Sequence, residues 1–243
     1  MKLWEALLMG LIQGLTEFLP VSSSGHLAIF QNIFKLNTQT GLLFDVMLHV
    51  GTLAAVIIVF WRDIYKLVIE GIGILADVCR NSYRFFKNLF SKGEKVKYRK
   101  VVRSSYRKFV MLVIVSTIPT GIIGFMAKDL VELAGTTLIV PGICLLITAV
   151  LLLIADDAKE GEKRPKTATY SNAFAIGIVQ GIATFPGISR SGATITACLF
   201  SGFEKKFAVK YSFIMSIPAI IGAAILELKD IGSEEIAKGE WIN

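Results

Sequence analysis

Two long apolar runs without a single charged residue restrict the fold of this 243-residue sequence more than any other feature. They are FVMLVIVSTIPTGIIGFMA (109–127) and TTLIVPGICLLITAVLLLIA (136–155). A helix needs roughly 20 apolar residues to cross the hydrocarbon core of a bilayer, and both runs reach that length. Two further apolar runs, 41–61 and 207–228, contain or adjoin only a few charges. The sequence therefore predicts an all-α integral, multi-pass membrane protein with about four full spans.

Composition supports a membrane protein and argues against an ordinary soluble domain. The chain is 53% hydrophobic and only 19% charged, with a mean hydropathy of +0.62, which is too apolar for an ordinary soluble domain. Cys79, Cys144 and Cys198 are far apart in the sequence and lack metal-ligand spacing, so we expect reduced cysteines without a structural role.

The positive charge is concentrated in one segment. Residues 62–108 hold 13 of the 26 lysines and arginines, between two predicted spans. The positive-inside bias makes this segment a cytoplasmic loop. Contact with anionic lipid headgroups is a second interpretation that stays open. Nucleic-acid binding is not expected, because the basic run lies between membrane spans and lacks a recognisable binding module.

The sequence contains an internal repeat. IQGLTEFLPVSSSGH (12–26) aligns without a gap on VQGIATFPGISRSGA (179–193) after a shift of 167 positions, with six identities in fifteen. In each copy an apolar half-length helix reaches a Pro or Gly break, a Ser-Gly loop follows, and a second short helix begins. The helices are too short to cross about 30 Å at 1.5 Å per residue. We therefore predict two re-entrant helical hairpins, at 3–36 and 171–202.

The order of the predicted elements gives their orientation. Three spans lie between the hairpins, so the second hairpin is inverted relative to the first, and the two loops should meet near the membrane midplane. The first repeat half covers residues 1–155, a charged linker covers 156–169, and the second half covers 170–243. Symmetry predicts two more helices after 207–228, so we expect a truncated copy or an abbreviated second half.

The positions at which the two repeats differ carry the candidate chemistry. Glu17 aligns with Thr184, Ser23 with Arg190, and His26 with Ala193. A charge at the centre of a bilayer costs at least about 2.5–3.5 kcal/mol, so intramembrane Glu and Arg are functional candidates. An ion pair that only holds the two halves together is the alternative.

The two serine-rich loops are suited to an anion. Each precedes a short helix, whose N-terminal N–H groups and positive dipole end attract negative charge, and glycine allows close approach. Arginine adds a planar cation that suits phosphate. The predicted phosphate-binding residues are Ser22, Ser24, Gly25, Ser189, Arg190, Ser191 and Gly192.

Together the two serine-rich motifs resemble those of a known family. QGLTEFLPVSSSGHL together with PGISRSGAT (186–194) resembles the signature pair of the bacitracin-resistance type undecaprenyl-diphosphate phosphatases. The similarity covers nearly the whole chain in segment order. It implies hydrolysis of a polyprenyl diphosphate lipid to the monophosphate and inorganic phosphate, which recycles the lipid carrier of cell-wall glycans. It also implies a divalent cation, Mg²⁺ or Ca²⁺, and location in the cell membrane.

Roles can be suggested for the candidate catalytic residues. We expect Ser23 to attack the terminal phosphorus, His26 to act as general base or acid, and Arg190 to stabilise charge on the phosphoryl group. Glu17 would help to hold the cation, with Gln13 one helical turn earlier. In a rival assignment, Glu17 activates Ser23 and His26 is the acid.

Several expectations stay open at this stage. Asp45 and His49, spaced i, i+4 in one span, are either a packed polar pair or groups that orient the catalytic residues. Asp156 and Asp157 fit a solvated helix end. A transporter or flippase of polyprenyl phosphate lipids is the alternative function, since inverted repeats with broken helices also build transporters. The surrounding membrane lipids are further partners, and a homodimer is one candidate for the oligomeric state.

Overall fold

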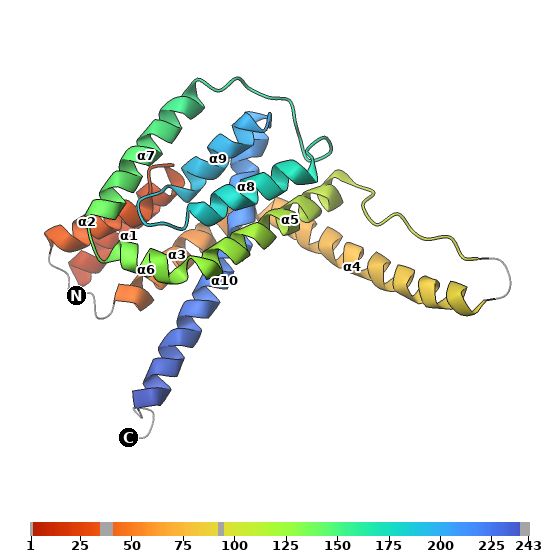
Figure 1. Cartoon of the computed structure of the whole chain (residues 1–243), viewed down its shortest axis with the longest axis horizontal. Coiled ribbons are helices and arrows are strands. Elements are labelled where there is room, and N and C mark those ends of the chain that lie inside the picture. Colours follow the sequence, from red (N-terminus) through yellow and green to blue (C-terminus); the bar gives the residue numbers. More distant parts are fainter. Residues whose placement is uncertain (1, 35–40, 92–94, 239–243) are drawn as a thin grey trace.

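A computed structural model describes residues 2–34, 41–91 and 95–238 of the chain. These residues form helices joined by turns and extended segments (Figure 1). The helices are α1 Leu3–Phe18, α2 Ser23–Ile33, α3 Gly41–Val59, α4 Trp61–Phe90, α5 Ser105–Met126, α6 Lys128–Gly135, α7 Ile139–Asp156, α8 Tyr170–Ile182, α9 Arg190–Phe200 and α10 Lys205–Lys238.

The described helices agree with an all-α membrane protein. Three of them contain stretches that are long and apolar enough to cross a membrane: 105–126, 139–156 and 205–226. These stretches correspond to the runs predicted at 109–127, 136–155 and 207–228. The fourth predicted span, 41–61, coincides with α3, whose fully described apolar part, Met47–Val59, is shorter.

Three features differ from the expected layout. The predicted loop 62–108 contains α4, a helix of 30 residues. The short helix α6 precedes α7 and ends directly before the span predicted at 136–155. Helix α10 continues beyond the span predicted at 207–228 and includes residues up to Lys238.

The bounds of the short helices follow the sequence repeat. Helices α2 and α9 each have 11 residues, and both their first and last residues are 167 positions apart. Ser22 and Ser189 cap them in the same way, each accepting a hydrogen bond from a glycine N–H, at 3.3 and 3.0 Å. A serine N-cap ends the preceding loop and satisfies an N–H at the helix start. The repeated sequence therefore produces repeated local structure.

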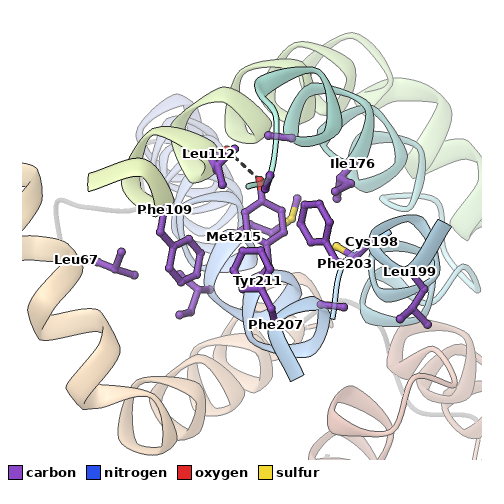
Figure 2. Close-up of a cluster of buried hydrophobic side chains, with 14 residues drawn as sticks. Leu67, Phe109, Leu112, Ile176, Cys198, Leu199, Phe203, Phe207, Tyr211 and Met215 are labelled. Atoms are coloured by element: carbon purple, nitrogen blue, oxygen red, sulfur yellow. Dashed lines mark hydrogen bonds between the residues drawn. The ribbon is translucent and has the colours of Figure 1, made fainter. Parts of the chain in front are cut away.

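The core lies where α5, α8, α9 and α10 meet. Figure 2 shows Phe203, Phe207 and Tyr211 packed together, with ring centroids of the two phenylalanines 5.1 Å apart. The Tyr211 hydroxyl donates to the carbonyl oxygen of Leu112 in α5 at 2.9 Å, so this fully buried side chain leaves no polar atom unpaired. The helices α8 and α9 are thereby packed against two of the candidate spans.

The contact of α5 with α8 is the most extensive between any two described helices. Two glycines of α8, one turn apart, make it possible. A Cβ on Gly177 would lie 2.2 Å from the carbonyl oxygen of Ser116, and one on Gly181 would lie 2.7 Å from the Cβ of Ile123. Small residues let membrane helices approach closely, because lipid supplies no hydrophobic drive for their association.

We expect Gly177→Ala to destabilise the protein, since the added methyl group meets backbone that cannot move aside. Overpacking of this kind costs about 1–3 kcal/mol. The melting temperature in detergent should fall accordingly. Gly121→Ala is the matched control, because Gly121 is exposed on α5 and its Cβ would meet no heavy atom within 4 Å. Equal melting temperatures for the two variants would contradict the proposed role of the glycine.

Candidate active site

The two serine-rich loops lie against each other. A Cβ on Gly25 would come within 3.0 Å of the Cα of Gly187, and one on Gly192 within 2.9 Å of the carbonyl oxygen of Pro20. The backbone N–H of Gly187 donates to Ser24 Oγ at 3.2 Å. Glycines at these positions are required by the close approach of the two chains. Gly187 also has a φ of +94°, which disfavours other residues there.

The Glu17 carboxylate connects the two loops. Glu17 is near the end of α1, and its Oε2 accepts from Ser23 Oγ at 2.6 Å and from Gln13 Nε2 at 3.3 Å. Its Oε1 accepts from the guanidinium of Arg190. The Glu17 side chain is 11% exposed and that of Arg190 is 22% exposed. The structure thus brings together four predicted site residues from α1, α2 and α9.

The geometry around this carboxylate follows from the repeat. Ser23 is the first residue of α2, and Arg190 is the first residue of α9. Both N-termini therefore direct a side chain at the same anion, and each helix brings its positive end to the site. A buried carboxylate needs such partners, because an uncompensated charge there would be costly.

His26 lies one turn into α2 and does not bond Ser23. Its Nδ1 lies 2.8 Å from the carbonyl oxygen of Ser22, the geometry of an N–H donor to that oxygen. With Nδ1 protonated, a neutral ring keeps Nε2 as its proton acceptor. Ser22 itself has a φ of +70°, a left-handed conformation that costs a non-glycine residue about 1–3 kcal/mol. The turn that orients His26 is therefore strained.

Most of the other predicted residues lie near this site, and one falls outside the described part of the chain. Ser191 Oγ donates to the carbonyl oxygen of Glu17 at 3.5 Å and lies 3.4 Å from Ser189 Oγ. His49, in α3, is close enough to interact electrostatically with the Glu17 carboxylate. The side chain of Asp45 lies outside the described residues. Asp156 and Asp157 are exposed at the end of α7, apart from the site.

One structural residue of the site was not predicted. Thr148, in α7, donates from Oγ1 to the carbonyl oxygen of Gly187 at 3.0 Å and accepts from the N–H of Ser189 at 2.9 Å. It satisfies the backbone of the second loop, where water is scarce. The signal available in the sequence was weak, because Thr148 is a single hydroxyl in an apolar run.

The site has some, but not all, of the ligands that a divalent cation needs. Among the described residues no three His, Cys, Asp or Glu side chains group as a metal site. The buried Oε1 of Gln13, beside Glu17, has no hydrogen-bond partner within the described part of the chain. A cation that takes one or two protein oxygens and completes its shell with substrate phosphate and water fits this donor set.

Comparison with known proteins shows that the sequence of the chain matches a family. The model of the family described as "Bacitracin resistance protein BacA" matches residues 6–242. An undecaprenyl-diphosphatase of Alkaliphilus metalliredigens is 43% identical over 231 residues, 95% of this chain and 78% of the relative. The undecaprenyl-diphosphatase of Methanosphaera stadtmanae is 40% identical over 229 residues, 94% of this chain and 78% of the relative.

A third relative extends the match to every residue of the chain. The undecaprenyl-diphosphatase of Halothermothrix orenii is 37% identical over 243 residues, which is 100% of this chain and 81% of the relative. The family match spans both serine-rich loops and the helices that carry Gln13, Glu17, Ser23 and Arg190. The chain belongs to the bacitracin resistance protein BacA family.

Proposed function

We propose that this protein is a phosphatase of the cell membrane that hydrolyses undecaprenyl diphosphate, or a similar polyprenyl diphosphate, to the monophosphate and inorganic phosphate. The observation that carries the proposal is the Glu17 carboxylate, which bonds the Ser23 hydroxyl of one loop and the Arg190 guanidinium of the other. The relatives, whose similarity covers more than nine tenths of this chain, are named for this activity. The product is the lipid carrier for cell-wall glycans, so the enzyme would recycle that carrier.

In the first step, Ser23 Oγ bonds to the terminal phosphorus while the bond from phosphorus to the bridging oxygen breaks. The Ser23 proton moves to Glu17 Oε2, which already accepts it in a hydrogen bond of 2.6 Å. The polyprenyl monophosphate leaves with the bonding electron pair. This arrangement favours the assignment of Glu17, rather than His26, as the base that activates Ser23.

In the second step, water attacks the phosphoserine. His26 Nε2 takes a proton from this water, since Nδ1 is engaged with the carbonyl oxygen of Ser22. Glu17 returns its proton to Ser23 Oγ as the bond from that oxygen to phosphorus breaks, and inorganic phosphate leaves. His26 then releases the water's proton to solvent, and the site returns to its starting state.

Arg190 is the group that binds and stabilises the phosphoryl charge. In the structure it bonds Glu17, and oxygens of an arriving diphosphate would compete for the same guanidinium. The planar fork can hold two phosphate oxygens at once, and its charge is in place before the reaction begins. The serines and glycines of the two loops would complete the phosphate-binding set: Ser22, Ser24, Gly25, Ser189, Ser191 and Gly192.

Gln13 and Glu17 would hold a divalent cation, Mg²⁺ or Ca²⁺. Support comes from the unpartnered, buried Oε1 of Gln13 next to the Glu17 carboxylate. When bound, the cation supplies positive charge that offsets the charge of the diphosphate.

Asp45 and His49 are proposed to orient the catalytic groups from α3, and the electrostatic proximity of His49 to Glu17 supports that role.

We further propose that α1–α2 and α8–α9 are re-entrant hairpins in an inverted-topology repeat. Helices α2, α8 and α9 have 11, 13 and 11 residues, too short for a bilayer that needs roughly 20. The loops between them carry polar backbone, which membranes tolerate only where it is buried in protein or lines a wet cavity. A homodimer stays a prediction.

Loss of the Arg190 guanidinium should reduce phosphate release strongly. We expect Arg190→Ala to lower kcat/KM at least about 100-fold, because one charge-stabilising donor supplies about 2.7–4 kcal/mol. The assay measures inorganic phosphate released from polyprenyl diphosphate by purified protein in detergent. Arg164→Ala is the control, since that exposed arginine pairs through its guanidinium with Glu204, 2.6 Å away. A loss below tenfold in Arg190→Ala would contradict the role of phosphate clamp.

A covalent intermediate should form on Ser23. We expect acid quenching of a reaction with substrate labelled in its terminal phosphate to trap phosphoserine at Ser23, and at neither Ser22 nor Ser24, by mass spectrometry. His26→Ala should raise the trapped amount, because attack by water is then slowed. The absence of label in wild type and His26→Ala alike would favour direct attack of water.

Lipid translocation that persists in Ser23→Ala would support the transporter alternative.

The metal requirement should depend on residue 13. We expect a chelator to abolish phosphate release and added Mg²⁺ or Ca²⁺ to restore it. Gln13→Ala should raise the cation concentration needed for half-maximal activity, and Gln13→Glu should lower it, because a carboxylate binds these cations better than an amide. If both variants titrate like wild type, the cation does not bind at Gln13.

A further inference from the structure

Helix α4 carries an apolar stripe that no other described part of the chain covers. The helix has 30 residues and is about 45 Å long. Large apolar side chains recur on one side every three or four positions, and they are 55–82% exposed. The members are Trp61, Tyr65, Val68, Ile72, Leu75, Tyr83, Phe86 and Phe90, with the exposed Cys79 among them.

The opposite side of α4 is occupied by the chain that follows it. Residues 95–101, which we name the strap, run back along this side without regular secondary structure. Asn88 exchanges two hydrogen bonds with the backbone of Val96, at 2.9 and 2.8 Å, and Asn81 exchanges two with Arg99, both at 2.8 Å. Arg84 donates to the carbonyl oxygen of Lys97 at 2.8 Å. The polar side of α4 therefore has its partner within the chain, and the apolar stripe does not.

A buried arginine fixes the direction of α4 relative to the bundle. Arg107, at the start of α5, is 2% exposed and donates to Glu70 and Asp77 of α4, both at 2.7 Å. Gly73 makes room for it, because a Cβ there would lie 2.6 Å from its Nη2. The hydrogen bonds from Arg107 lower the pKa of both carboxyls, so the contact persists at neutral pH and weakens only as acid protonates them.

The charges beside the stripe are of one sign. The acidic residues of α4 already have partners in the bundle: Asp63 with Lys210 and Tyr106, and Glu70 and Asp77 with Arg107. The basic side chains beside the stripe lie along one of its edges: Arg62, Lys66, Arg80 and Lys87. Soluble surfaces rarely expose so large an apolar area, and α4 carries too many charges to be counted among the candidate spans.

We propose that α4 lies in the plane of the membrane surface, with its stripe at the boundary of headgroups and acyl chains and its basic edge on anionic phospholipids. Amphipathic helices with Lys and Arg beside Trp, Phe and Leu bind lipid in this way. Figure 1 shows α4 leading away from the bundle at the end where α5 begins. Helix α10 begins near the same place, since Lys210 bonds Asp63 at 2.8 Å.

The cysteines of the chain allow a direct test. Cys79 is exposed within the stripe, whereas Cys144 and Cys198 are buried. The protein would be reconstituted as one copy per nanodisc of phosphatidylcholine and phosphatidylglycerol and treated with a water-soluble maleimide that does not cross membranes. The reagent attacks the thiolate, which is disfavoured away from water, so we expect Cys79 to react at least about tenfold more slowly than the cysteine of Cys79→Ser/Lys97→Cys, whose label site lies on the strap.

Charge removal tests the lipid class. Omitting phosphatidylglycerol should speed the reaction of Cys79, and Arg62→Gln/Arg80→Gln/Lys87→Gln should remove this dependence on lipid. Lys95→Gln/Lys97→Gln/Lys100→Gln is the matched control, with the same charge loss on the strap, and should keep it. Equal rates at both labelled positions would overturn the proposal, and no effect of phosphatidylglycerol in wild type would overturn its anionic part. If Cys79 is protected from the maleimide only in discs that hold two copies of the protein, the stripe contacts a second copy and the proposal of lipid contact is overturned.

Discussion

An ionised carboxylate within an apolar helical bundle must be compensated, and the arrangement around Glu17 follows from that need. Arg190 neutralises it from the second loop, and Ser23 and Gln13 supply hydrogen bonds from the first hairpin. An ion pair that only holds the halves together would not require a serine hydroxyl at 2.6 Å. In the proposed mechanism the pair is exchanged: phosphate oxygens take over the guanidinium and leave the carboxylate free to accept the serine proton.

The repeat supplies a common backbone frame with different side chains. Gln13 and Gln180 are both about 1% exposed, and both have an Oε1 without a hydrogen-bond partner in the described residues. Only Gln13 has a carboxylate one turn later, since Glu17 is replaced by Thr184 in the second copy. The same frame therefore holds the proposed nucleophile and base in one half and the cation of Arg190 in the other.

The sequence predicted the parts of the site that depend on local rules. Proline and glycine breaks and serine caps determine where α2 and α9 begin, and the 167-residue shift matches their bounds. It could not predict contacts between distant segments, such as Gly25 against Gly187 or Thr148 on the second loop. Helix α4 was not predicted, because the many basic residues of this segment are typical of a loop between spans. Its apolar residues form a stripe only at the helical period.

The two hairpins differ in how firmly they are held, and this difference suits their proposed tasks. Gly177 and Gly181 press α8 against α5, and the aromatic core around Tyr211 holds α9 and α10 to the same span. Arg190 thus projects from a rigid frame, which electrostatic stabilisation requires, since the charge must not reorganise during the reaction. On α1, Leu3, Leu7, Leu11 and Leu15 are more than half exposed, and Ser22 holds a strained turn. The groups proposed to exchange partners, Glu17 and Ser23, therefore belong to the less constrained half, where a small movement costs least.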